Sequence, residues 1–155
     1  MYRKAAEQGH ASAQNTLGWM HAKGDGVVQS YVEAVRWYKK AAKQGDANAQ
    51  LNLGSMYENG DGVAQSHAEA LRWYRKAAEQ GDAGAQFFLG LMYGQGKGVA
   101  KNTILAHMWM NLAASQGIPS AIKFREIAAS QMTKQQIAEA QLRATQCQAK
   151  NYKDC

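Results

Sequence analysis

The chain repeats itself with a period of 36 residues. The stretch from Ala47 to Gly81 recurs 36 positions earlier, from Ala11 to Gly45, and 36 positions later, from Ala83 to Gly117. Over residues 41–76, 22 of 36 residues match the residue 36 before, and 18 of 36 match the residue 36 after. A fixed period in this range is typical of solenoids, in which stacked units bury one continuous core. The period therefore predicts a stack of similar units.

Each unit contains two predicted helices. Helix A covers roughly residues 11–22, 47–58 and 83–94, with cap positions at His10, Asp46 and Asp82. Two glycines in a G-x-G-V loop then suit a left-handed helix end and a tight turn. Helix B follows Ser30, Ser66 and Asn102, and Ser30 with Glu33 and Ser66 with Glu69 predict reciprocal capping boxes.

Helix B carries an apolar face. In the first unit it consists of Ala34, Trp37, Tyr38, Ala41 and Ala42, a spacing that places all five residues on one side of a helix. We interpret the aromatic residues as core rather than as a cofactor site. The predicted structural core is Leu17, Trp37, Tyr38, Leu53, Trp73, Tyr74, Leu89 and Trp109.

A chain of 155 residues suits one domain. We expect repeats at about 11–45, 47–81 and 83–117, a truncated half repeat at 1–10, a C-terminal cap at 118–149 and a tail at 150–155. The cap lacks the Leu-Gly pair and the glycine loop, and ends in a helix from about 134 to 148. Because residues 2–9 match the end of helix B, we expect a cut in a longer array. The cut end predicts possible end-to-end self-association, and a removed segment could have held a signal peptide.

The charges argue against a nucleic-acid partner. The net charge is +6, but residues 45–80 carry three basic and five acidic groups, so basic residues do not recur along the repeats. No run of 18 apolar residues is present, and no membrane span is expected.

Catalytic and metal-binding motifs are absent from the sequence. The histidines are His10, His21, His67 and His107, and none lies in an H-E-x-x-H arrangement. We expect His67 and His107 to be solvated surface residues. No serine nucleophile elbow and no paired metal motif is found, so the expectation is a protein without enzyme activity, cofactor or metal.

The only cysteines, Cys147 and Cys155, lie after the repeats. A disulfide between them would pin the C-terminus and would indicate an oxidising compartment. Two free thiols or half of a metal site are the alternatives. The disulfide favours a periplasmic or secreted location, with a cytoplasmic one as the alternative.

The motifs W-Y-x-K-A-A-x-Q-G, A-Q-x-x-L-G-x-M-Y and G-x-G-V resemble those of the Sel1-like repeat family, a relative of the tetratricopeptide repeats. The resemblance covers residues 2–118 closely. It implies an α/α solenoid that serves as an adaptor for protein complexes. One cysteine-rich branch has been linked to β-lactam binding, but its repeats each carry a disulfide, whereas these repeats contain no cysteine. We therefore expect a right-handed α/α superhelix with a C-terminal capping helix.

The repeats differ from one another along one side of helix A. The variable positions lie four and then three residues apart, on one helix face. We call them the helix-A row: Asn15, Trp19, Leu51, Ser55, Glu58, Phe87, Leu91, Lys123 and Ile127.

In solenoids of this kind the first helices line the concave surface, where partners bind. We expect a non-catalytic scaffold that binds a protein or peptide through the helix-A row, with an exposed tryptophan and phenylalanine as anchors. The row could instead fill the space between stacked helices. The alternative function is a peptidoglycan or β-lactam ligand-binding protein or hydrolase of the cysteine-rich type.

Overall fold

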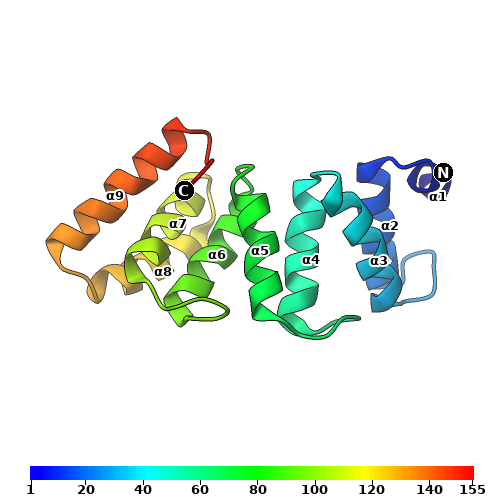
Figure 1. The fold of residues 1–155 in the computed structure, drawn as a ribbon, viewed down its shortest axis with the longest axis horizontal. Helices are drawn as coiled ribbons and strands as arrows, with labels where there is room; N and C mark the ends of the chain where they lie inside the picture. Colours follow the sequence, from blue (N-terminus) through cyan, green and yellow to red (C-terminus); the bar gives the residue numbers. More distant parts are fainter. The chain divides into compact units, whose positions relative to one another are not determined.

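The computed structural model describes residues 1–155 and contains nine α-helices and no strand (Figure 1). The chain forms two compact units, Met1–Trp73 and Tyr74–Cys155, which we describe one at a time.

The first unit contains α1 (Tyr2–Glu7), α2 (Ala11–Lys23), α3 (Tyr31–Lys43), α4 (Ala47–Asn59) and the first part of α5 (His67–Ala78). Within it α2 packs against α1 and α3, and α3 packs against α4. Helices α2 and α4 are the predicted helix A of two successive repeats, and each extends one residue beyond its expected end.

The second unit begins within α5 and continues with α6 (Ala83–Gln95), α7 (Thr103–Ser115), α8 (Pro119–Ser130) and α9 (Lys134–Ala149). Helix α7 is its centre, because α6, α8 and α9 all pack against it. Ala140, Ala144 and Cys147 are buried on α9, so this helix covers the end of the unit as the sequence predicts.

The glycine loops end each helix A in the same way. Gly24, Gly60 and Gly96 adopt left-handed conformations, and the amide of Gly24 donates to the carbonyl of Met20 at 2.8 Å. The second loop glycine of the next repeat, Gly62, has a φ of +67° and lies against the backbone of Tyr31. Positive φ and close backbone approach both favour glycine there.

The helices start at the predicted cap positions, although His10 makes no side-chain cap hydrogen bond. The Ser30 hydroxyl accepts the amide of Glu33 at 3.2 Å. The Glu33 carboxylate lies 3.5 Å from Arg36 one turn along the helix, so the predicted reciprocal capping box at Ser30 is wrong. The complete box forms at Thr133 and Gln136, where each side chain bonds the backbone amide of the other residue.

The predicted structural core residues are all buried: Leu17, Trp37, Tyr38, Leu53, Trp73, Tyr74, Leu89 and Trp109. The Leu-Gly pair of helix A makes this packing possible. A Cβ added to Gly18 would lie 2.7 Å from the ring of Tyr38, so only glycine lets this ring rest on α2. Burial raises the pKa of the Tyr38 phenol to about 12.

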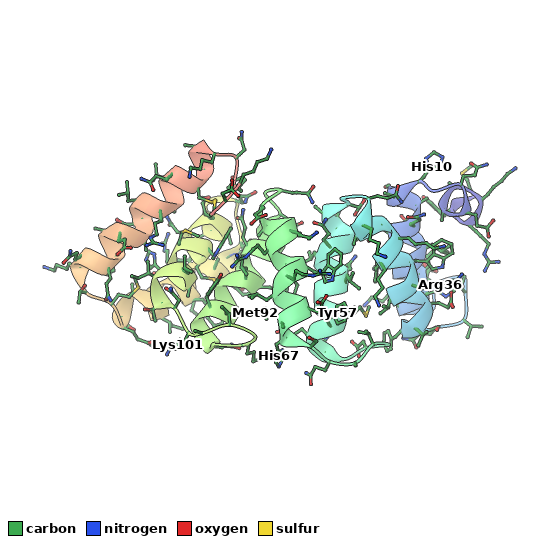
Figure 2. The ribbon with its side chains drawn as sticks, viewed as in Figure 1. His10, Arg36, Tyr57, His67, Met92 and Lys101 are labelled. Atoms are coloured by element: carbon green, nitrogen blue, oxygen red, sulfur yellow. A yellow bond between two sulfur atoms is a disulfide. The ribbon has the colours of Figure 1, made fainter.

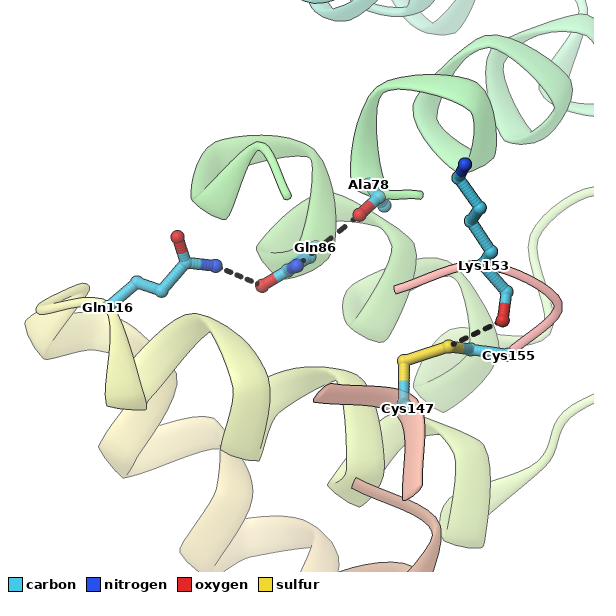
Figure 3. The surroundings of a disulfide bond; sticks show 6 residues. All are labelled: Ala78, Gln86, Gln116, Cys147, Lys153 and Cys155. Carbon is cyan, nitrogen blue, oxygen red and sulfur yellow. Dashed lines mark hydrogen bonds between the residues drawn. A yellow bond between two sulfur atoms is a disulfide. The ribbon is translucent and has the colours of Figure 1, made fainter. Parts of the chain in front are cut away.

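A buried glutamine in each helix A joins it to the preceding helix B. The side chain of Gln86 donates from Nε2 to the carbonyl of Ala78 at 3.3 Å and accepts from Gln116 at 2.7 Å (Figure 3). Gln14 makes the same two bonds, to the carbonyl of Ala6 and from Gln44. Each glutamine therefore satisfies a carbonyl at a helix end that would otherwise lack a partner.

The packing of α8 on α7 departs from this pattern. Arg125 on α8 occupies the position at which the earlier repeats have leucine, and its guanidinium donates to Asn111 of α7 at 2.9 Å. Polar contacts thus replace part of the apolar core between α7 and α8.

Candidate functional site

In the first unit the residues of the helix-A row are partly exposed to solvent. Trp19 on α2 keeps 45% of its surface exposed. Leu51, Ser55 and Glu58 on α4 are half-buried. Asn15 is also half-buried, and its Oδ1 accepts from Asn52 of α4 at 3.1 Å, so it joins two neighbouring A helices. Trp19 is therefore the exposed aromatic side chain of the row.

In the second unit some residues of the helix-A row are packed between helices and others are exposed. Phe87 is half-buried rather than exposed as expected. Its ring forms T-shaped pairs with Phe88 and Phe124, with ring centroids 5.6 and 5.7 Å apart. It packs on the cluster that contains Met110, so it fills space between helices. Lys123 is exposed on α8.

The remaining two row residues of this unit, Leu91 and Ile127, border a hollow between α6, α7 and α8. Its volume is about 170 Å³. Its larger apolar lining residues are Leu91, Met110, Phe124 and Ile127; the small ones are Gly90, Gly94, Ala106 and Ala128; and the polar ones are Gln95, Lys101, Thr103 and Gln131. We call this site the α6–α8 hollow.

The hollow exists because small residues meet there. Ala128, Gly94 and Thr103 are each smaller than the residues at equivalent positions of the earlier repeats. Those equivalents are Met20, Met56 and Met92 for Ala128, Ala22 and Glu58 for Gly94, and Tyr31 and His67 for Thr103. A comparison of the repeats identifies these small residues from the sequence. The structure is needed to show that they face one another.

The histidines differ in burial. His107 is 3% exposed on α7, so the prediction of a solvated surface histidine is wrong there. Burial lowers the pKa of His107, and the nearby Arg125 guanidinium lowers it further, so the ring is neutral at pH 7. His67 is half-buried on α5, whereas His10 is exposed before α2 (Figure 2). No group of three or more His, Cys, Asp or Glu residues is arranged to hold a metal ion.

The C-terminal tail is tied back to the second unit. A disulfide joins Cys147 at the end of α9 to Cys155, with the two Cα atoms 5.4 Å apart (Figure 3). Inside the loop, the amide of Tyr152 donates to the carbonyl of Cys147 at 2.8 Å. The Tyr152 ring lies on Gly81, in the turn between α5 and α6. The disulfide therefore holds the tail over that turn.

The helix pairs, glycine loops and glutamine bonds define an α/α solenoid repeat protein. The Sel1 repeat matches residues 1–10, 11–46, 47–82 and 83–118, and the chain belongs to this family. Sel1 repeat proteins are generally protein-interaction scaffolds and are typically non-enzymatic. No curated protein matches the chain.

Three solved structures from bacteria are similar. A protective antigen of uropathogenic Escherichia coli with an SLR fold shares 35% identity and a TM-score of 0.90 over 97% of this chain. A Sel1 repeat protein from Oxalobacter formigenes shares 40% identity and a TM-score of 0.74, covering 81% of this chain and 94% of its own. Helicobacter pylori cysteine rich protein B shares 28% identity and a TM-score of 0.63, covering 77% and 92%. The present chain spans 32% of the length of the E. coli antigen.

No helix has the length and apolar character needed to span a bilayer.

Proposed function

We propose that this chain is a non-catalytic scaffold that binds a partner protein or peptide through its helix-A row. The observation that carries the proposal is the α6–α8 hollow, since two residues of the row, Leu91 and Ile127, border it. Small concave sites with an apolar lining and a few polar groups suit side-chain recognition. In the first unit the exposed ring of Trp19 offers the kind of aromatic anchor that is enriched among binding hot spots.

The chemistry of the hollow supports binding over hydrolysis. Its lining includes a threonine and a lysine but no serine, carboxylate or histidine, and the family is typically non-enzymatic. This composition favours the scaffold over the peptidoglycan or β-lactam alternative.

We further propose a periplasmic or secreted location, because disulfides persist in oxidising compartments. Alkylation of intact cells before lysis, followed by mass measurement of the chain, tests this location. The proposal expects unmodified Cys147 and Cys155, whereas two alkylated thiols would place the chain in a reducing compartment.

Affinity capture from the source cells tests the binding face. Three baits are compared: the unchanged chain, the Trp19→Ala variant and the Val28→Ala variant. Val28 is 87% exposed in the loop after α2 and lies outside the row, so it is the matched control. A partner retained by Val28→Ala and lost by folded Trp19→Ala supports the row. Equal capture by all three baits would contradict a role for Trp19 in binding.

A further inference from the structure

The size of the α6–α8 hollow limits what it can hold. Its volume of about 170 Å³ is close to that of an engineered cavity that accommodates a benzene ring, about 150 Å³. Sites for drug-sized ligands start at about 300 Å³. The hollow therefore has room for one leucine- or phenylalanine-sized side chain, not for a cofactor.

The charged lining of the hollow is a single lysine. Lys101 is the only charged lining residue; it is exposed just before α7 and forms no salt bridge (Figure 2). Lys123 lies four residues before Ile127 on α8, and helix geometry places both on one face. A carboxylate beside the inserted side chain would meet these lysines, and an ammonium group would be repelled.

Two neutral amides complete the lining. Gln95 at the end of α6 and Gln131 just after α8 are both exposed and both line the hollow. A side-chain amide donates and accepts, so each can pair with the backbone of an extended peptide.

We propose that the α6–α8 hollow receives one large apolar side chain of an acidic segment in the partner protein, with Lys101 pairing the neighbouring carboxylate. This inference rests on the proposed scaffold function and adds the chemistry of the partner. Apolar burial supplies the affinity, and Lys101 selects acidic flanks over basic ones.

A methyl NMR titration of the whole chain tests the proposal with three synthetic peptides. The first is a short acidic peptide with one central leucine; the second has alanine in place of that leucine; the third keeps the leucine between lysines. We expect the first peptide to shift the methyl signals of Leu91, Met110 and Ile127 saturably. The alanine peptide should bind roughly tenfold more weakly or worse, because one buried leucine side chain is lost.

Two variants with matched controls locate the site. Ala128→Met restores the residue of the earlier repeats and fills the hollow, with Ala138→Met on the exposed part of α9 as its control. Lys101→Glu reverses the rim charge, with Lys97→Glu, which is exposed in the same loop but does not line the hollow, as its control. We expect Ala128→Met to abolish the shifts and Lys101→Glu to reverse the preference between acidic and basic leucine peptides.

A third variant guards against misfolding. Gly94→Ala adds a Cβ that would lie 3.6 Å from the Cβ of Ala106, an ordinary contact, so it narrows the hollow without disturbing α6. Its affinity for the acidic leucine peptide should fall between those of the unchanged chain and Ala128→Met.

The proposal is overturned if the acidic leucine peptide shifts no methyl group near the hollow, or if the acidic and basic leucine peptides bind equally. It is also overturned if folded Ala128→Met binds as the unchanged chain does. These results would leave the proposed function standing if Trp19→Ala still loses a captured partner. Peptide binding at the hollow, with capture unaffected by Trp19→Ala, would support this inference and remove Trp19 from the binding face.

Discussion

Substituting alanine for Gly62 should destabilise the chain far more than the same substitution at Gly26, although both are the second glycine of a G-x-G-V loop. Their φ angles are nearly equal, +67° and +66°. An alanine in the left-handed region costs about 1–2 kcal/mol at either position. The two sites therefore share their backbone strain and differ only in their surroundings.

The surroundings of Gly62 are backbone atoms that cannot rotate away. An added Cβ would lie 2.3 Å from the carbonyl carbon of Tyr31 and 2.6 Å from the amide nitrogen of Val32. At Gly26 the nearest atom is the end of the flexible Met20 side chain, at 3.5 Å. Relieving the clash requires the loop after α4 to move away from the start of α3, and overpacking of this kind costs about 1–3 kcal/mol.

The expected loss of unfolding free energy is about 1–2 kcal/mol for Gly26→Ala and about 2–5 kcal/mol for Gly62→Ala. Urea unfolding followed by circular dichroism measures both, and the m-value shows whether the transition stays cooperative. Hydrogen exchange should also rise at the first amides of α3 in Gly62→Ala only. Equal losses for the two variants would refute the contact between the α4–α5 loop and α3.

Three further predictions concern the second unit. Gln86→Leu should cost about 2–4 kcal/mol in urea unfolding, because one buried and one partly buried hydrogen bond are lost; a loss well below 1 kcal/mol would contradict this role. Replacing Cys147 and Cys155 by serine should cost about 2.5 kcal/mol through release of a nine-residue loop, and an unchanged melting temperature would show that the bond is dispensable. The lowered pKa of His107 means that, as the pH falls below the usual histidine value, the unfolded chain binds a proton that the folded chain excludes. Stability should therefore fall as the pH drops below about 6.5, the ordinary pKa of histidine. His107→Gln should flatten this fall and exposed His10→Gln should not; identical pH profiles for the two variants would contradict it.

Much of the fold follows from the repeat. The period places the helix pairs, and the Gly-x-Gly loops mark where each helix A ends, because few other residues tolerate the left-handed conformation. Ser30 and Asn102 likewise mark where helix B begins. These features are local, so the sequence alone determines them.

The parts that sequence reasoning missed depend on which helices meet. Phe87 occupies a variable position, yet α8 presents Phe124 to it and the ring is half-buried. His107 occupies the helix position of Val35 and Leu71 in the earlier repeats, and it is covered because α8 and α9 both pack on α7. Glu33 stands at the right position for a capping box, but its carboxylate pairs with Arg36 on the same helix. In each case a contact between residues, not the identity of one residue, decides the outcome.

The most direct measurement of the proposed binding face is site-specific photo-crosslinking in the source cells. A photoreactive amino acid replaces Trp19 or Ile127, each 45% exposed on the helix-A row, and in separate controls replaces Val28 or Leu142, which are more exposed and lie off the row. The proposed scaffold function predicts that the row positions crosslink the same partner protein and that the control positions do not. Crosslinks to that partner from Val28 or Leu142, with none from Trp19 or Ile127, would contradict it.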